Sequence, residues 1–181
     1  MKRALVIVDI QNDYFPGGRM PLVDAESAAA RAAELLAAIR ARDEAIFHVQ
    51  HVSTRAGATF FLPDTDGVAI HAAVAPRAGE TVVVKHTPNS FRETTLGAQL
   101  QAAGVGQLVF AGMMTHMCID TSVRAAADAG YQCSLAGDAC ATRDLAWQGA
   151  AVPAAQVQRA FLAALNGAFA RVAATAELLS A

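Results

Sequence analysis

Short apolar runs rich in β-branched residues recur along the chain and predict buried strands. They cover Ala4–Ile10, Ala45–Val52, Thr81–His86, Gln107–Gly112 and Tyr131–Ala136. Most of these runs do not alternate apolar and polar residues. They are therefore typical of strands that are covered on both faces.

The stretches between these runs favour helices. They are Asp24–Arg42, about Thr94–Ala103, Thr115–Ala129 and Pro153–Asn166, the last with proline at its start and Gly167 just past its end. A final run, Arg171–Leu178, fits either a sixth strand or a helix. Strands that alternate with helices predict an α/β fold with a doubly wound, mainly parallel, Rossmann-like sheet of about six strands flanked by helices. We expect a single domain over residues 1–181.

Composition and charge argue against a membrane-spanning protein and against a nucleic-acid partner. Hydrophobic residues make up 54% of the chain, yet no uninterrupted apolar run, Ala4–Val8 included, is long enough to span a membrane. The net charge is −2 and there is no basic patch, so we expect no nucleic-acid partner. The apolar excess is larger than one small domain needs, which predicts a homo-oligomer, either a dimer or a tetramer.

Cysteine usage points to a reducing compartment. The three cysteines, Cys118, Cys133 and Cys140, are an odd number and include no CxxC pair, so neither a disulfide framework nor a cysteine-based zinc site is expected. The first segment, MKRALVIVDIQND, resembles a strand more than a signal peptide. We therefore expect a cytoplasmic protein.

One long irregular stretch, Ser53–Gly79, interrupts the alternation of strands and helices. Its paired aromatics, Phe60 and Phe61, argue against disorder. Long loops inside compact domains are usually functional. We expect this loop either to cover a substrate site or to contact another subunit.

Three reactive side chains lie at the ends of predicted strands. Asp9 lies near the end of the first strand, Lys85 near the end of TVVVKH, and Cys118 just beyond QLVFAG. Ligands of open parallel sheets bind beyond the carboxyl ends of the strands, so these residues can converge there on one site. Each also has an ordinary explanation, as a buried small hydrophobe, a helix cap or a solvated strand end.

The segment around Cys118 predicts a nucleophile. If Thr115 caps the following helix, Cys118 lies in the first helical turn, where the helix dipole and a nearby ammonium would lower the thiol pKa. Free N–H groups of that turn could hold an oxyanion, and Asp9 could accept the thiol proton. Together these residues favour acyl transfer. We expect Cys133 to lie in the core and Cys140 to approach the site without a role.

The five histidines do not predict a metal site. His48 and His51 are three residues apart in a strand and should point to opposite faces. His86 and His116 lie closer to the expected site and could orient a substrate. The sequence has no GxGxxG or Walker pattern after a strand, so we expect no nucleotide cofactor and no metal.

Three motifs give the chain a family resemblance. With Asp9 in VDIQNDYF, Lys85 in VVVKHTPNSF and Cys118 in AGMMTHMCIDTSVRAA, it resembles the isochorismatase-like cysteine hydrolases, which include nicotinamidases and carbamoylsarcosine amidohydrolases. The resemblance implies that these three residues are a catalytic triad. It also implies a cis peptide at Met113–Met114 and an oxyanion hole formed by the N–H groups of Met114 and Cys118.

The chain departs from two groups within this family, and these departures refine the activity that we expect. Nicotinamidases carry an Asp-x-His metal motif where this chain has HVQHVS, and siderophore-pathway isochorismatases generally lack the catalytic cysteine that this chain has. We therefore expect hydrolysis of a small amide or related C–N bond through a thioester. The alternatives are nicotinamidase or isochorismatase activity, or a non-catalytic oligomer that binds a small molecule or a protein. Candidates for an apolar pocket wall are Phe15, Phe60, Phe61 and Phe91.

Overall fold

A single parallel sheet forms the centre of the molecule. The computed structural model describes residues 1–180, and its six-stranded sheet has the order β3-β2-β1-β4-β5-β8 with every neighbouring pair parallel. The strands are Lys2–Val8 (β1), Ala45–His51 (β2), Thr81–Lys85 (β3), Val105–Met113 (β4), Gln132–Ala141 (β5) and Arg171–Ala173 (β8). The doubly wound parallel sheet expected from the sequence is confirmed.

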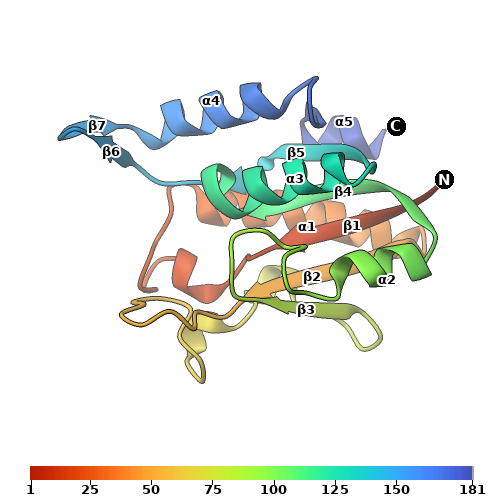
Figure 1. Cartoon of the computed structure of the whole chain (residues 1–181), viewed down its shortest axis with the longest axis horizontal. Helices are drawn as coiled ribbons and strands as arrows, with labels where there is room; N and C mark the ends of the chain where they lie inside the picture. The colour runs from red at the N-terminus through yellow and green to blue at the C-terminus, as the bar shows by residue number, and fades with distance from the viewer. Residues whose placement is uncertain (181) are drawn as a thin grey trace.

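Helices cover both faces of this sheet (Figure 1). They are Ala25–Ala41 (α1), Leu96–Ala102 (α2), Asp120–Asp128 (α3), Ala154–Leu165 (α4) and Thr175–Leu179 (α5). Successive residues of β1 face opposite sides: Leu5 and Ile7 pack in the core with α1 and α5, whereas Val6 and Val8 pack in the core with α2 and α3. This double burial explains why the strands read as continuous apolar runs. Among the described residues, no helix has both the length and the apolar character needed to cross a membrane.

The structure corrects several element boundaries. The expected helix Thr115–Ala129 is divided into a single π-helical turn, Thr115–Ile119, and α3, which begins at Asp120. The C-terminal run forms both of the elements considered for it, first β8 and then α5. β5 continues past Ala136 because its pairing with β4 shifts register between Phe110 and Gly112 and then resumes at Cys140.

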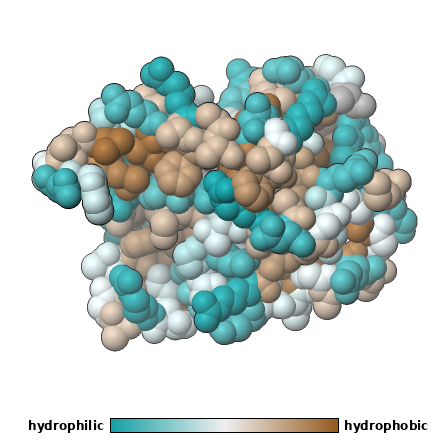
Figure 2. All heavy atoms as spheres, turned by 45° about the horizontal axis from the view of Figure 1, so that its top comes forward, coloured by the Kyte–Doolittle hydropathy of each residue, from teal (hydrophilic) through white to brown (hydrophobic). Residues whose placement is uncertain are grey.

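A projecting hairpin was not predicted. Strands β6 (Leu145–Trp147) and β7 (Ala150–Val152) pair antiparallel in a separate two-stranded sheet. In Figure 1 the hairpin extends away from the main body, next to α4, and Figure 2 shows apolar residues over this part of the surface. The hairpin also carries Trp147, which is 74% exposed. Each strand has only three residues, too few for the alternating pattern to stand out.

The Ser53–Gly79 loop packs against the segment that follows β1. It contains two short 3-10 turns, Asp66–Val68 and Ala72–Val74. Gln11 Nε2 donates a hydrogen bond to the Val68 carbonyl at 2.7 Å, and the Phe61 N–H donates to Asp13 Oδ2 at 2.6 Å. The loop is thereby anchored beside the carboxyl ends of β1 and β2.

A glycine permits close contact at this edge of the sheet. Gly112, near the end of β4, has φ of +142°, and a Cβ at this position would lie 2.0 Å from the Val8 carbonyl oxygen. Any larger residue would force β4 away from β1. Since Asp9 follows Val8 and the turn with Cys118 follows β4, Gly112 helps to keep the two segments together.

Candidate active site

The structure brings Asp9, Lys85 and Cys118 together at the carboxyl edge of the sheet. Asp9 directly follows β1, Lys85 is the last residue of β3, and Cys118 lies in the turn after β4. Asp9 and Lys85 are fully buried, and Cys118 is only 5% exposed. The expected convergence of three distant strand ends is therefore present in the fold.

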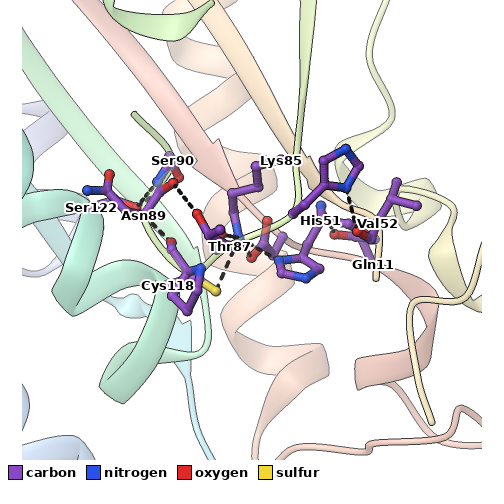
Figure 3. A network of polar contacts seen from close by, with 12 residues as sticks. Gln11, His51, Val52, Lys85, Thr87, Asn89, Ser90, Cys118 and Ser122 are labelled. Atoms are coloured by element: carbon purple, nitrogen blue, oxygen red, sulfur yellow. Dashed lines mark hydrogen bonds and ion pairs between the residues drawn. The ribbon is translucent and has the colours of Figure 1, made fainter. Parts of the chain in front are cut away.

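The Lys85 ammonium lies at the centre of this cluster (Figure 3). Its Nζ is 2.7 Å from Asp9 Oδ2, 3.2 Å from Cys118 Sγ and 2.9 Å from His51 Nδ1. It also donates to the Thr87 carbonyl at 3.1 Å. A lysine ammonium has only donors to offer, so every one of these neighbours acts as an acceptor toward it.

Electrostatics hold the lysine charged and the cysteine neutral. Burial opposes the ammonium charge, but the Asp9 carboxylate and the hydrogen bond that Cys118 Sγ accepts outweigh it, and the net effect is a raised pKa for Lys85. For Cys118, burial raises the thiol pKa, the Asp9 carboxylate raises it further, and Lys85 only partly offsets them. The expected lowering of the thiol pKa is wrong, because desolvation of a thiol beside a carboxylate outweighs the helix end and the ammonium.

The turn that carries Cys118 also differs from the expected capped helix. Met114 occupies the N-cap position of the π-helical turn, and the Met113–Met114 peptide bond is cis. Thr115 does not cap this turn, because its hydroxyl donates to the Ala141 carbonyl at the end of β5. This hydrogen bond ties the turn that carries Cys118 to β5.

His51 and Gln11 belong to the site, although sequence reasoning did not assign them to it. His51 is the last residue of β2, the strand between β1 and β3, and its register partner is Lys85. The buried Gln11 side chain donates to the His51 carbonyl at 2.9 Å and accepts from the His51 N–H at 2.8 Å. The signal for His51 in the sequence is its position at the end of the strand in HVQHVS.

A second set of contacts joins the segment after Lys85 to the helix after Cys118. The Ser122 hydroxyl of α3 accepts from the Ser90 N–H at 3.0 Å and lies 2.8 Å from the Ser90 hydroxyl. Both serines are fully buried. Figure 3 shows these contacts next to Cys118. They fix the two segments that supply the ammonium and the thiol relative to each other.

One group of side chains within residues 1–180 has the composition of a metal site. Asp9, His51 and Cys118 each offer a ligand atom, and these atoms lie within 4.8 Å of one another. The Lys85 ammonium contacts all three residues, so a cation already occupies this position. His48 is turned away from the group, as expected, and its Nε2 lies 2.9 Å from Glu80 Oε2.

Two of the expected pocket residues lie near this network. The Phe61 ring is 5.9 Å from the His51 ring and 4.6 Å from the Tyr14 ring, and Phe60 packs on Phe61 at 4.9 Å between ring centroids. Tyr14 was not among the candidates. These aromatic residues place an apolar wall beside His51.

The other candidates make different contacts. Phe15 stacks on His71 at 3.7 Å, and Phe91 packs near Tyr131 at 6.2 Å. His86 is exposed, with Nδ1 2.8 Å from the Val52 carbonyl oxygen, whereas His116 Nδ1 contacts the Thr142 hydroxyl. Within the described part of the chain, none of these four residues makes a polar or aromatic contact with Asp9, Lys85 or Cys118.

The two other cysteines lie outside the network. Cys133 is half-buried in β5, and burial raises its pKa to about 11. Cys140, near the end of β5, is buried, which raises its pKa to about 12, and its thiol donates to the Ala136 carbonyl at 3.3 Å. Cys118 thus differs from both in having a carboxylate and an ammonium beside it.

Comparison with known proteins covers almost the whole chain. The family model described as the isochorismatase domain matches residues 3–177. An isochorismatase family protein of Bacillus subtilis is 51% identical over 179 residues, 99% of each chain. A streptothricin hydrolase of Streptomyces noursei is 34% identical over 79% of this chain and 51% of its own length. A crystal structure described as an isochorismatase hydrolase of Oleispira antarctica superposes with a TM-score of 0.96 at 50% identity, covering 99% of this chain and 97% of that one.

Proposed function

The chain belongs to the isochorismatase family of hydrolases, and from this membership and its site we propose that it cleaves the C–N bond of a small amide through a thioester on Cys118. The observation that carries the proposal is the buried Lys85 ammonium in contact with both the Asp9 carboxylate and Cys118 Sγ. Amidohydrolases that act on ureidoacrylate and on maleamate are among the relatives of this chain, which supports C–N bond hydrolysis.

In the first half-reaction, Cys118 Sγ attacks the amide carbonyl while its proton passes to Asp9. A ligand atom of Asp9 lies within 4.8 Å of Sγ, close enough for transfer once substrate draws the groups together. The C–N bond then breaks, and the proton on Asp9 leaves with the departing amine. The N–H groups of Met114 and Cys118 are assigned to the developing oxyanion.

In the second half-reaction, water attacks the thioester. Asp9, again ionised, takes a proton from the water, and the proton is returned to Cys118 Sγ as the acid product leaves. Lys85 keeps its charge throughout and favours both the Asp9 carboxylate and the transient thiolate. A raised thiol pKa suits this sequence, because proton transfer accompanies attack and no resting thiolate is needed.

A substrate screen tests the proposed activity. Primary amides and ureido compounds are incubated with the wild-type protein and with Cys118→Ala, and ammonia release is measured. Release by the wild type alone supports the proposal. Ammonia from nicotinamide alone, or pyruvate from isochorismate alone, would replace it with one of these two family activities. No turnover of any compound, with an unreactive Cys118, would favour a non-catalytic binding protein.

The cellular setting is part of the same proposal. All three cysteines are free, which supports a reducing compartment and hence the cytoplasm. The apolar surface over the projecting hairpin and α4, with the exposed Trp147, supports a homo-oligomer, either a dimer or a tetramer (Figure 2). Sedimentation would measure the oligomeric state, and a monomer at all concentrations would contradict this part.

A further inference from the structure

His51 is fixed in place more firmly than a solvated strand end would be. Gln11 bonds to both its N–H and its carbonyl group, so the peptide on either side of the imidazole is clamped. The Lys85 ammonium bonds to its ring at Nδ1, and the Phe61 ring packs 5.9 Å away. Figure 3 shows the ring beside the lysine that also contacts Cys118. The protein thus controls the orientation of this side chain within the catalytic cluster.

The contact with Lys85 determines which ring nitrogen carries the proton. A lysine ammonium can only donate, so His51 Nδ1 must accept and the proton of the neutral ring must lie on Nε2. The titratable groups that act on the ring are Lys85, Asp9 and His86. Burial, followed by the Lys85 charge, lowers the pKa of His51 to about 4, which keeps the ring neutral near pH 7.

The Nε2–H group is left without a partner in the protein. No hydrogen bond among residues 1–180 uses this atom, and it is absent from the set of fully buried polar atoms that lack a partner. It is therefore accessible from solvent while its ring belongs to the catalytic cluster. A fixed donor in this position can form a hydrogen bond with a bound molecule.

We propose that His51 is a substrate-binding residue whose Nε2–H donates to an acceptor oxygen one or two bonds beyond the carbonyl carbon that Cys118 attacks. The proposal rests on the proposed function and adds a substrate class to it: small amides that carry a second acceptor, such as a carbonyl or carboxylate oxygen, next to the scissile amide. A neutral donor whose ring centroid lies 5.9 Å from that of the apolar Phe61 ring suits a compact, partly polar molecule.

The protonation state can be measured without any substrate. Nitrogen-15 spectra of histidine-labelled wild-type protein, with the His51 signal assigned by its loss in His51→Asn, report which ring nitrogen is protonated. We expect a proton on Nε2 alone from pH 8 down to about pH 5. A proton on Nδ1, or titration near the ordinary histidine value, would overturn the proposal.

Two alkylating reagents test the contact itself. In each reaction Cys118 Sγ forms a bond to carbon, iodide leaves, and the thiol proton passes to base. Iodoacetamide carries an acceptor oxygen on the atom next to the attacked carbon, whereas methyl iodide has none. A general change in thiol reactivity alters both rates at Cys118. The ratio of the two rates therefore reports the effect of the acceptor oxygen alone.

Two His51 variants distinguish a hydrogen bond from Nε2 to the reagent from the contact between Nδ1 and Lys85. His51→Asn keeps an acceptor oxygen near the position of Nδ1 but has no donor at the position of Nε2, and His51→Gln restores a donor there. We expect the ratio of iodoacetamide to methyl iodide rates to fall roughly three- to tenfold in His51→Asn, the range for one hydrogen bond, and to recover partly in His51→Gln.

The matched control is His71→Asn, whose ring accepts a bond from the Ala73 N–H within its own turn; it should leave the ratio unchanged. An unchanged ratio in folded His51→Asn, or equal loss of both rates, would overturn the proposal. Since neither measurement needs amide turnover, a result in favour of His51 combined with an inactive wild type would reject only the proposed function.

Discussion

The buried pair of Lys85 and Asp9 allows its contribution to stability to be separated from its contribution to reactivity. At 2.7 Å and an effective dielectric constant of about 20, the attraction between the two charges is about 6 kcal/mol before desolvation is subtracted. Lys85→Met leaves a buried carboxylate without its cation, and Asp9→Asn leaves a buried ammonium without its anion. Removing one partner of a buried pair typically costs about 3–5 kcal/mol of the free energy of unfolding. The double variant has neither charge, so we expect it to be more stable than either single variant.

Reactivity should follow a different pattern. All three variants should alkylate Cys118 about a hundredfold or more slowly than wild type near pH 7, because each lacks the proton acceptor, the neighbouring cation or both. Urea unfolding gives the stabilities, and mass spectrometry of iodoacetamide-treated protein gives the rates. Recovered stability without recovered reactivity is the expected combination. If the stability losses add in the double variant, or a folded single variant reacts like wild type, the reasoning about a single coupled unit is refuted.

Three further predictions concern the reactivity of Cys118, the role of metal ions and a second ion pair. Brief iodoacetamide treatment near neutral pH should label Cys118 before the other two cysteines, because Cys118 has both Asp9 nearby to take its proton and the Lys85 ammonium in contact with its sulfur. Earlier labelling of either other cysteine, in peptide mass maps, would count against the site. Exhaustive chelation should leave amide turnover nearly unchanged, since the Lys85 ammonium already supplies the cation; activity lost on chelation and restored by zinc would show the opposite. Glu80→Gln should lower the free energy of unfolding by about 2 kcal/mol at pH 7, because it weakens the 2.7 Å pair with Arg40. Arg40 is the largest influence that lowers the pKa of Glu80, to about 2, so its stabilisation is present above pH 4.5 and is lost toward pH 2. Urea unfolding at several pH values should therefore show the variant and the wild type converging in acid, and a constant difference would contradict this assignment.

The arrangement of the sheet could be predicted because each strand carries its own signal. Apolar runs buried on both faces, separated by helical stretches, are sufficient to indicate a parallel sheet, and the carboxyl-edge rule then brings Asp9, Lys85 and Cys118 together. The β6–β7 hairpin escaped prediction because three-residue strands show no periodicity. The π-helical turn escaped because its backbone depends on how β4 ends, and on the hydrogen bond of Thr115 to the end of β5.

The chemistry of the site was only partly predictable. Residue type and strand position predict a nucleophile, a base and a cation, but the thiol pKa depends on burial and on the placement of the Asp9 carboxylate. His51 illustrates the same limit. Its position beside Lys85 requires β2 to lie between β1 and β3. The strand order of the sheet sets this arrangement, and sequence motifs alone do not reveal it.

The most direct test of the central claim is the detection of an acyl group on Cys118 during turnover. Once the screen supplies an amide substrate, the reaction is quenched with acid within the first turnovers and the digested protein is analysed by mass spectrometry. The account predicts that the acyl part of the substrate is attached to Cys118 as a thioester that hydroxylamine removes, and that Cys118→Ala forms no adduct and releases no ammonia. Ammonia release by folded Cys118→Ala at the wild-type rate would contradict it.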